Sequence, residues 1–208
     1  FSEKNLRYGL HFMFSHNNVY TANVFKNNDA GIAVMYSRNV GMFKNKFLEN
    51  WGDGVYGLLL KDLTFSKIKN NIFRNNTVGI FMDGASKVDL YHNEFVNNGW
   101  GLKINANCME NRLMNNNFEN NTFDVSTSGS LVMNSFRNNY WDKYEGYDLD
   151  KDKIGDVPFH PLSLYAVLAE KNSMIMLLYR TFFVEILDRS EKLVPSLTPE
   201  NFVDEQPM

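Results

Sequence analysis

Two methionines and two histidines near the start of the chain are the side chains best suited to metal chemistry. Met13 and Met35 lie 22 residues apart, and His11 precedes Met13 by two residues. Thioether sulfur is a soft ligand that selects Cu(I) over hard cations, and imidazole also binds copper. With His16 close by, we predict a copper site at His11, Met13, Met35 and His16. The alternative is an exposed methionine patch that contacts another protein.

A second candidate is an acidic segment, in which Asp148, Asp150 and Asp152 alternate along the chain. Oxygen ligands at positions i, i+2 and i+4 open the calcium loop of EF-hands. The rest of that template fails, because Lys153 replaces its glycine and Phe159 stands where its bidentate glutamate belongs. An acidic turn that caps the end of the fold is the preferred interpretation, and a calcium site is the alternative.

Composition excludes several other classes. With 21 basic and 24 acidic residues, the chain lacks the basic excess that nucleic-acid binding requires. Cys108 is the single cysteine, which excludes an internal disulfide and a cysteine-based zinc site. The longest apolar run, residues 174–179, is far too short for a transmembrane helix. Because Phe1 is not an initiator methionine, we expect a piece of a longer protein that lacks N-terminal coils.

A sequence repeat must position the candidate ligands. Of 29 asparagines, 27 precede Trp141. The template Asn-x-Phe-x-x-Asn occurs six times, with successive phenylalanines 22, 26, 22, 23 and 18 residues apart, at Phe25, Phe47, Phe73, Phe95, Phe118 and Phe136. A glycine followed by an aliphatic residue comes six positions after three of them, at Gly31, Gly79 and Gly101. A period near 22 residues with short apolar alternations predicts an all-β parallel solenoid in which each repeat forms one coil.

Alternation within each repeat predicts which side chains face the core. Three inward rows are expected: Leu10, Ile32, Leu58, Ile80 and Leu102; Phe12, Val34, Leu60, Met82 and Ile104; and Tyr20, Met42, Ile68, Leu90, Leu113 and Leu131. Phe14 should also face inward, whereas His11, Met13 and Ser15 face outward, because strand side chains repeat with period two. Met13 and Met35 would then lie about 5 Å apart at the backbone. The repeated Phe and Asn residues are structural, since amides hydrogen-bond along a stack and asparagine tolerates left-handed corners.

Beyond Pro158 the pattern becomes helical. A short helix is predicted at 164–171, and a second helix runs from a cap at Ser173 to about Asp188. The second helix is apolar over more than one face, so it would either plug the solenoid end or bind a partner at a membrane surface. We expect a β-helix with an acidic capping turn at 1–158, and a helical extension with an extended tail at 159–208.

The sequence resembles the NosD family of periplasmic, right-handed parallel β-helix proteins. These work with an ABC transporter in the maturation of nitrous oxide reductase. The resemblance is carried by residues 9–15, 35–37, 139–141, 148–158, 197–200 and 203–205. It implies an accessory protein without catalytic activity that supplies copper, or a sulfur species, to the reductase. It also implies three partners: a transporter membrane subunit bound through the C-terminal helices, a copper chaperone and the reductase itself.

The rival prediction is a carbohydrate-active β-helix, either a polysaccharide lyase or an epimerase, because this architecture also carries such enzymes. Their chemistry needs a base beside the sugar carbon and a cation that neutralises the substrate carboxylate. The outward positions do not gather such groups. Lys61 and Lys103 stand in different columns, and Asp83 has no evident partner base. We therefore predict a binding protein and keep the enzyme as the alternative.

Overall fold

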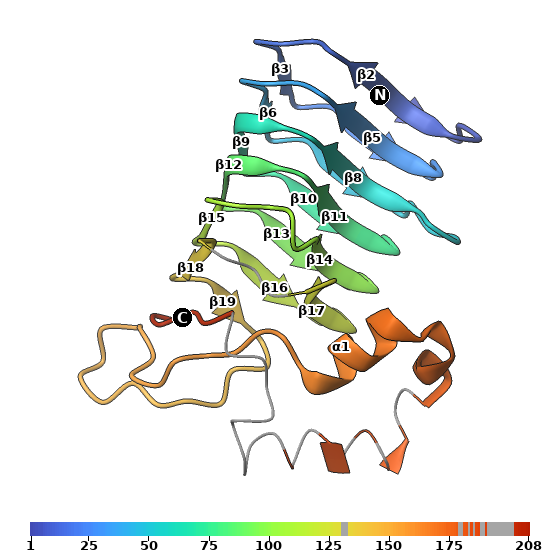
Figure 1. The fold of residues 1–208 in the computed structure, drawn as a ribbon. Helices are drawn as coiled ribbons and strands as arrows, with labels where there is room; N and C mark the ends of the chain where they lie inside the picture. Colours follow the sequence, from blue (N-terminus) through green and yellow to red (C-terminus); the bar gives the residue numbers. More distant parts are fainter. Residues whose placement is uncertain (130–132, 179–180, 183, 185, 188–189, 191–201) are drawn as a thin grey trace.

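The chain winds into a parallel β-solenoid of about six turns with about 22 residues per coil, which confirms the predicted fold class (Figure 1). This computed structural model describes residues 1–129, 133–178, 181–182, 184, 186–187, 190 and 202–208. Three parallel sheets form its walls, and each strand pairs with the equivalent strand of the next coil.

Sheet A consists of β1 (Ser2–Glu3), β4 (Val24–Lys26), β7 (Lys46–Leu48), β10 (Ile72–Arg74), β13 (Glu94–Val96), β16 (Asn117–Glu119) and β19 (Tyr140–Trp141). Sheet B consists of β2 (Tyr8–Met13), β5 (Ala30–Met35), β8 (Tyr56–Lys61), β11 (Val78–Asp83), β14 (Trp100–Ile104) and β17 (Phe123–Thr127). Sheet C consists of β3 (Val19–Thr21), β6 (Gly41–Phe43), β9 (Thr64–Lys69), β12 (Ser86–Tyr91), β15 (Arg112–Met114) and β18 (Ser135–Arg137).

The core contains the predicted inward rows. Ile32, Leu58, Ile80 and Leu102 are fully buried register partners across sheet B. The glycine that precedes each of these residues lets the coils approach closely: a Cβ atom on Gly57 would lie 2.7 Å from the carbonyl oxygen of Gly79. Leu131 of the predicted third row lies outside the described residues. Phe136 pairs with Leu113 in that row instead.

A stack of aromatic rings runs along sheet A. Phe25, Phe47, Phe73, Phe95 and Phe118 are successive partners, with ring centroids 4.6–5.4 Å apart. The six-copy template would place Phe136 sixth in this column, but the structure has Trp141 there, 4.3 Å from Phe118, and Phe136 lies in sheet C. In the last coil the Asn-x-Phe-x-x-Asn template spans the strand of sheet C instead of the strand of sheet A. Both strands follow an asparagine and both bury a large apolar side chain, so the template fits either one. Tyr140 points outward with 40% exposure.

Two asparagine ladders close the corners beside sheet A: Asn23, Asn45, Asn71, Asn93, Asn116 and Asn139; and Asn28, Asn50, Asn76, Asn98 and Asn121. The backbone N–H and Nδ2 of Asn71 both donate to Oδ1 of Asn93 at 3.0 Å, and Nδ2 also donates to the carbonyl oxygen of Met42. The left-handed conformation falls on the residue before each ladder position, such as Asn70 with a φ of 56°. Ladder asparagines therefore hydrogen-bond, and their predecessors make the turn.

Each ladder ends at a buried aspartate. The backbone N–H and Nδ2 of Asn139 donate to Oδ2 of Asp204 at 3.0 and 2.9 Å, and Nε1 of Trp141 donates to the same oxygen. In the other ladder, Nδ2 of Asn121 donates to Oδ1 of Asp124 at 3.2 Å. Since every amide donates toward the next coil, the last asparagine needs an acceptor, and a carboxylate supplies it.

The C-terminal residues cover the last coil. Helix α1 (Leu164–Lys171) confirms the first predicted helix, and its cap Ser163 accepts a hydrogen bond from the backbone N–H of Ala166. Tyr165 of α1 lies against Phe123 of β17, and Phe202 packs on Phe136. Figure 1 shows α1 lying beneath β17 at this end of the solenoid.

The second predicted helix differs at its start. Residues Ser173–Leu178 form the 3₁₀ helix η1, and Oδ1 of Asn172 accepts a hydrogen bond from the backbone N–H of Met174. Several positions between 179 and 189 lie outside the described residues, as do Pro195 and Pro199 of the predicted tail. In the part of the chain that the structure describes, every helix is too short or too polar to cross a membrane.

Candidate metal centre

Met13 and Met35 are register partners in the parallel pair β2 and β5, at the ends of the two strands. Parallel strands hold their backbones about 4.8 Å apart, so the two thioethers start from adjacent points on sheet B. Met13 is 41% exposed, and Met35 is partly buried. The structure therefore brings the two predicted sulfur ligands together on an open face.

His11 lies two residues before Met13 on β2, and its Cα partner on β5 is Ala33. Its exposed ring stacks on Tyr8 at a centroid distance of 4.7 Å. Among the described residues, none forms a hydrogen bond to the ring nitrogens of His11. The stack with Tyr8, which the sequence pattern did not predict, limits where this imidazole can point while leaving its nitrogens available for a metal.

His16 lies beyond the corner that follows β2. Its Nδ1 accepts a hydrogen bond from the backbone N–H of Arg38 at 3.2 Å. A neutral imidazole whose Nδ1 is an acceptor carries its proton on Nε2, so neither nitrogen offers a free lone pair in this arrangement. His16 becomes a metal ligand only by giving up the bond to Arg38, whereas Met13, Met35 and His11 need no such change.

The corner after the methionines differs from the predicted alternation. Phe14 has a φ of 50° and is 69% exposed, and its ring stacks on that of Tyr36 at 5.1 Å. Placing Phe14 inward was therefore wrong, because a left-handed residue ends the period-two alternation. Ser15 and Ser37 then turn inward: Ser37 is buried, and its Oγ accepts from the backbone N–H of Ser15.

Cys108, the other soft ligand in the chain, is fully buried. Burial raises the pKa of its thiol to about 11, so the group stays protonated at neutral pH. A thiol must lose its proton to bind a metal as a thiolate. Thioether and imidazole groups are therefore the accessible soft-metal ligands of the described coils.

The acidic turn does bring its three carboxylates together. Oxygens of Asp148, Asp150 and Asp152 lie within 4.8 Å of one another, and all three residues are exposed. These carboxylates also accept backbone N–H bonds, including those from Asp152 and Lys153 to Asp148. The backbone N–H of Asp152 opposes a rise in the pKa of Asp150, but the carboxylates around it and partial desolvation raise that pKa overall. The segment is a turn stabilised by hydrogen bonds between its own carboxylates and backbone N–H groups, and its calcium binding stays a prediction.

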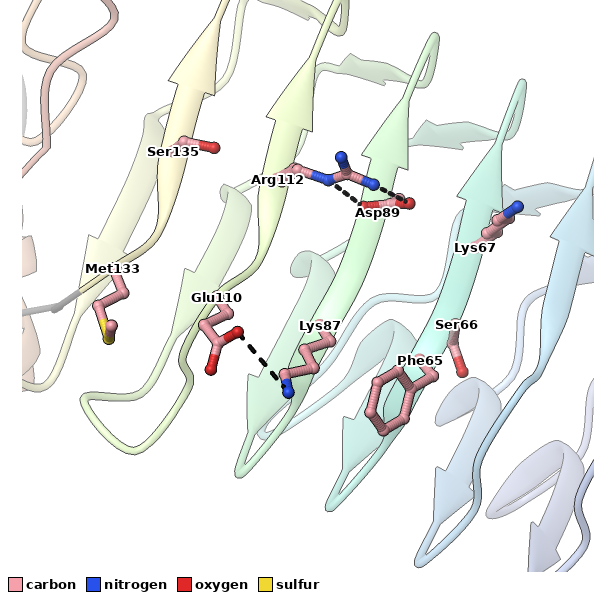
Figure 2. Close-up of a pocket in the computed structure, with 9 residues that line it drawn as sticks. All are labelled: Phe65, Ser66, Lys67, Lys87, Asp89, Glu110, Arg112, Met133 and Ser135. Carbon is pink, nitrogen blue, oxygen red and sulfur yellow. Dashed lines mark hydrogen bonds and ion pairs between the residues drawn. The ribbon is translucent and has the colours of Figure 1, made fainter.

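An open groove of about 550 Å³ on sheet C is where carbohydrate chemistry would have room (Figure 2). Two rows of side chains line it, one from each of four successive coils: Lys67, Asp89, Arg112 and Ser135; and Phe65, Lys87, Glu110 and Met133. Arg112 binds Asp89 through two hydrogen bonds of 2.7 and 2.8 Å, and Lys87 lies 3.7 Å from Glu110. Both carboxylates in this groove are paired with basic residues, so neither is free to act as a general base, and the enzyme remains the alternative.

The fold and these side chains define a parallel β-helix protein with paired thioethers and an exposed imidazole on the outer face of one sheet. The family model described as "Periplasmic copper-binding protein (NosD)" matches residues 2–146, so the chain belongs to the NosD family. That description names copper and makes no mention of calcium. Comparison with curated proteins gave no match.

Proposed function

We propose that this chain carries one Cu(I) ion on the outer face of sheet B, as an accessory protein for nitrous oxide reductase maturation. Met13 and Met35 would supply the sulfur ligands and His11 a nitrogen ligand, with His16 joining only if its bond to Arg38 breaks. The single observation that supports the proposal is the register pairing of the two methionines beside an exposed histidine. Soft thioethers on an open face suit reversible transfer of a soft monovalent ion.

An anaerobic Cu(I) competition titration against a chromophoric chelator tests this site. We expect one ion per chain for the native protein and loss of binding in Met13→Leu/Met35→Leu. The control is Met109→Leu/Met133→Leu, since these methionines are also exposed, at 47% and 68%, but lie elsewhere. Binding that survives the first double substitution, or that only the second one abolishes, contradicts the proposed ligands. If the native chain does not compete at all, a sulfur species becomes the preferred cargo.

We further propose that the two parts divide the work, with the solenoid at 1–158 holding the ion and residues 159–208 binding the membrane subunit of an ABC transporter. Four exposed apolar residues, spaced by four along the sequence and called the apolar row below, support this division: Met174, Leu178, Phe182 and Ile186, which are 41–76% exposed. Exposed apolar patches of this kind mark protein interaction sites. A copper chaperone and the reductase would meet the ion at sheet B.

Co-purification with the transporter tests the apolar row. Phe182→Ser/Ile186→Ser should abolish it, because the substitutions remove apolar contact area without touching the solenoid. Deletion from Ser173 onward is a poorer test, since it also removes Asp204 from the end of the ladder. The matched control is Trp51→Ser, which alters a 65% exposed aromatic residue far along the chain. Unchanged co-purification of the serine double variant would contradict docking through this row.

A further inference from the structure

The column of side chains that contains the methionine pair continues with two charged residues. Met35 has Lys61 as its partner on β8, and Lys61 in turn has Asp83 as its partner on β11. With a strand spacing of about 4.8 Å, the backbone of Lys61 lies one step from Met35 and two steps from Met13. A cation held between the thioethers would therefore have an ammonium group as its neighbour in the same column.

Asp83 is a fixed counter-charge for this lysine. Its Oδ2 lies 3.7 Å from Nζ of Lys61, and its Oδ1 accepts hydrogen bonds from Nδ2 of Asn105 and Asn107 at 3.1 and 2.9 Å. The two amide bonds and the nearby Lys61 hold the pKa of Asp83 below its ordinary value, despite partial desolvation. The carboxylate is therefore ionised at neutral pH, and it attracts the ammonium toward β11, away from the methionines.

We propose that Lys61 limits the affinity of the methionine pair and biases it toward a monovalent ion, and that Asp83 sets the strength of this effect. The inference rests on the proposed copper site. Repulsion between like charges grows in proportion to the charge of the bound ion, so a divalent ion is penalised about twice as strongly as Cu(I). For a separation of about 7 Å between the bound ion and the Lys61 ammonium, and an effective dielectric constant between those of water and a protein surface, the repulsion lowers Cu(I) affinity roughly three- to tenfold.

The two members of the ion pair give opposite predictions. Lys61→Gln should raise Cu(I) affinity roughly three- to tenfold, because it removes the repulsion. Asp83→Asn should lower the affinity, because the ammonium loses its counter-charge. Lys61→Arg should leave it unchanged, since the charge is kept. Lys61→Met should exceed Lys61→Gln, because it adds a third thioether to the column.

The experiment is the Cu(I) competition titration, run at low and at high salt on the native chain and on these variants. Lys67→Gln is the matched control, because Lys67 is an exposed lysine on sheet C. Melting temperatures establish that each variant is folded. Salt should shrink the differences among the charge variants, since it screens exposed charges. A merely structural role of the ion pair would not give this salt dependence.

The outcomes separate this inference from the proposed site. If the native chain binds Cu(I) and Met13→Leu/Met35→Leu does not, but Lys61→Gln and Asp83→Asn leave the affinity unchanged or shift it in the same direction, the role of Lys61 is overturned and the site stands. If the native chain and all variants fail to bind, the site and this inference fall together. Opposite shifts that salt suppresses support both.

Discussion

At the scale of single residues, Asp124 is the buried carboxylate at which the second asparagine ladder ends. Its carboxylate is 3% exposed and accepts from Nδ2 of Asn121, while Nζ of Lys143 lies 3.0 Å from its other oxygen. Burial raises the pKa of Asp124, and the Lys143 ammonium and the Asn121 amide oppose the rise. The ladder thus ends on a group that is easier to protonate in the folded than in the unfolded chain.

This pKa predicts a pH dependence of stability. A raised folded-state pKa means that the extra stability of the protonated form is present below the ordinary aspartate pKa of about 4, and is lost as pH rises through the raised value. Against Asp124→Asn, which cannot ionise, the native chain should therefore lose relative free energy of unfolding as the pH increases from 4 to 8. Urea unfolding at a series of pH values measures the difference. If the native chain instead gains free energy of unfolding relative to Asp124→Asn as the pH increases, the ion pair with Lys143 outweighs the cost of burial.

At the scale of elements, the asparagine ladders join neighbouring coils at the corners beside sheet A. Each interior ladder amide both donates and accepts hydrogen bonds. Its removal therefore leaves several buried groups without a hydrogen-bond partner at once. For Asn71 these groups are the backbone N–H and Nδ2 of Asn45 and the carbonyl oxygen of Met42. The neighbouring Asn70 is exposed and serves the turn through its backbone conformation.

Asn71→Ala should lower the free energy of unfolding by about 2–4 kcal/mol. Each buried group that loses its hydrogen-bond partner costs about 1–3 kcal/mol, and relaxation of the surrounding structure recovers part of this. Asn70→Gly is the control, since glycine adopts the left-handed conformation without strain and no ladder bond is lost. Its expected cost is below about 1 kcal/mol. Equal losses in the two variants, measured by chemical denaturation, would contradict the structural role assigned to the ladder.

Much of this element-level structure is predictable from the sequence, because the repeat period and the period-two alternation act locally. The inward rows, the ladders and the methionine pairing follow from them. Two local errors have clear physical causes. The left-handed Phe14 interrupts the alternation, and the last coil buries Phe136 in sheet C and Trp141 in sheet A, two positions that the template cannot distinguish. The stack of Tyr8 on His11 and the bond from Arg38 to His16 depend on side-chain geometry that no spacing encodes.

At the scale of the whole molecule, residues 202–208 return to the solenoid and close its end. Asp204 lies 65 residues from Asn139 along the chain and outside the repeat, so sequence periodicity could not reveal its role. Its backbone pairs with Phe159, and its side chain receives the last ladder amide. The C-terminal segment is therefore part of the folded core, although helical residues separate it from the coils.

Asp204→Ala should destabilise the whole solenoid. The substitution leaves the backbone N–H and Nδ2 of Asn139 and Nε1 of Trp141 buried without their acceptor. Each buried donor without an acceptor costs about 1–3 kcal/mol, and relaxation of the structure recovers part of the total. We therefore expect the free energy of unfolding to fall by about 3–5 kcal/mol. Glu205→Ala is the control, since Glu205 is exposed. A native-like denaturation curve for Asp204→Ala would show that the end of the ladder needs no acceptor.

The central claim is that sulfur from adjacent coils holds the copper ion, and X-ray absorption spectroscopy at the copper edge tests it most directly. The Cu(I)-loaded native chain should show two sulfur scatterers and at least one nitrogen scatterer in the first shell. Any copper that Met13→Leu/Met35→Leu still retains should show no sulfur signal, whereas the signal should persist in Met109→Leu/Met133→Leu. A first shell of nitrogen and oxygen alone in the native chain would contradict the account.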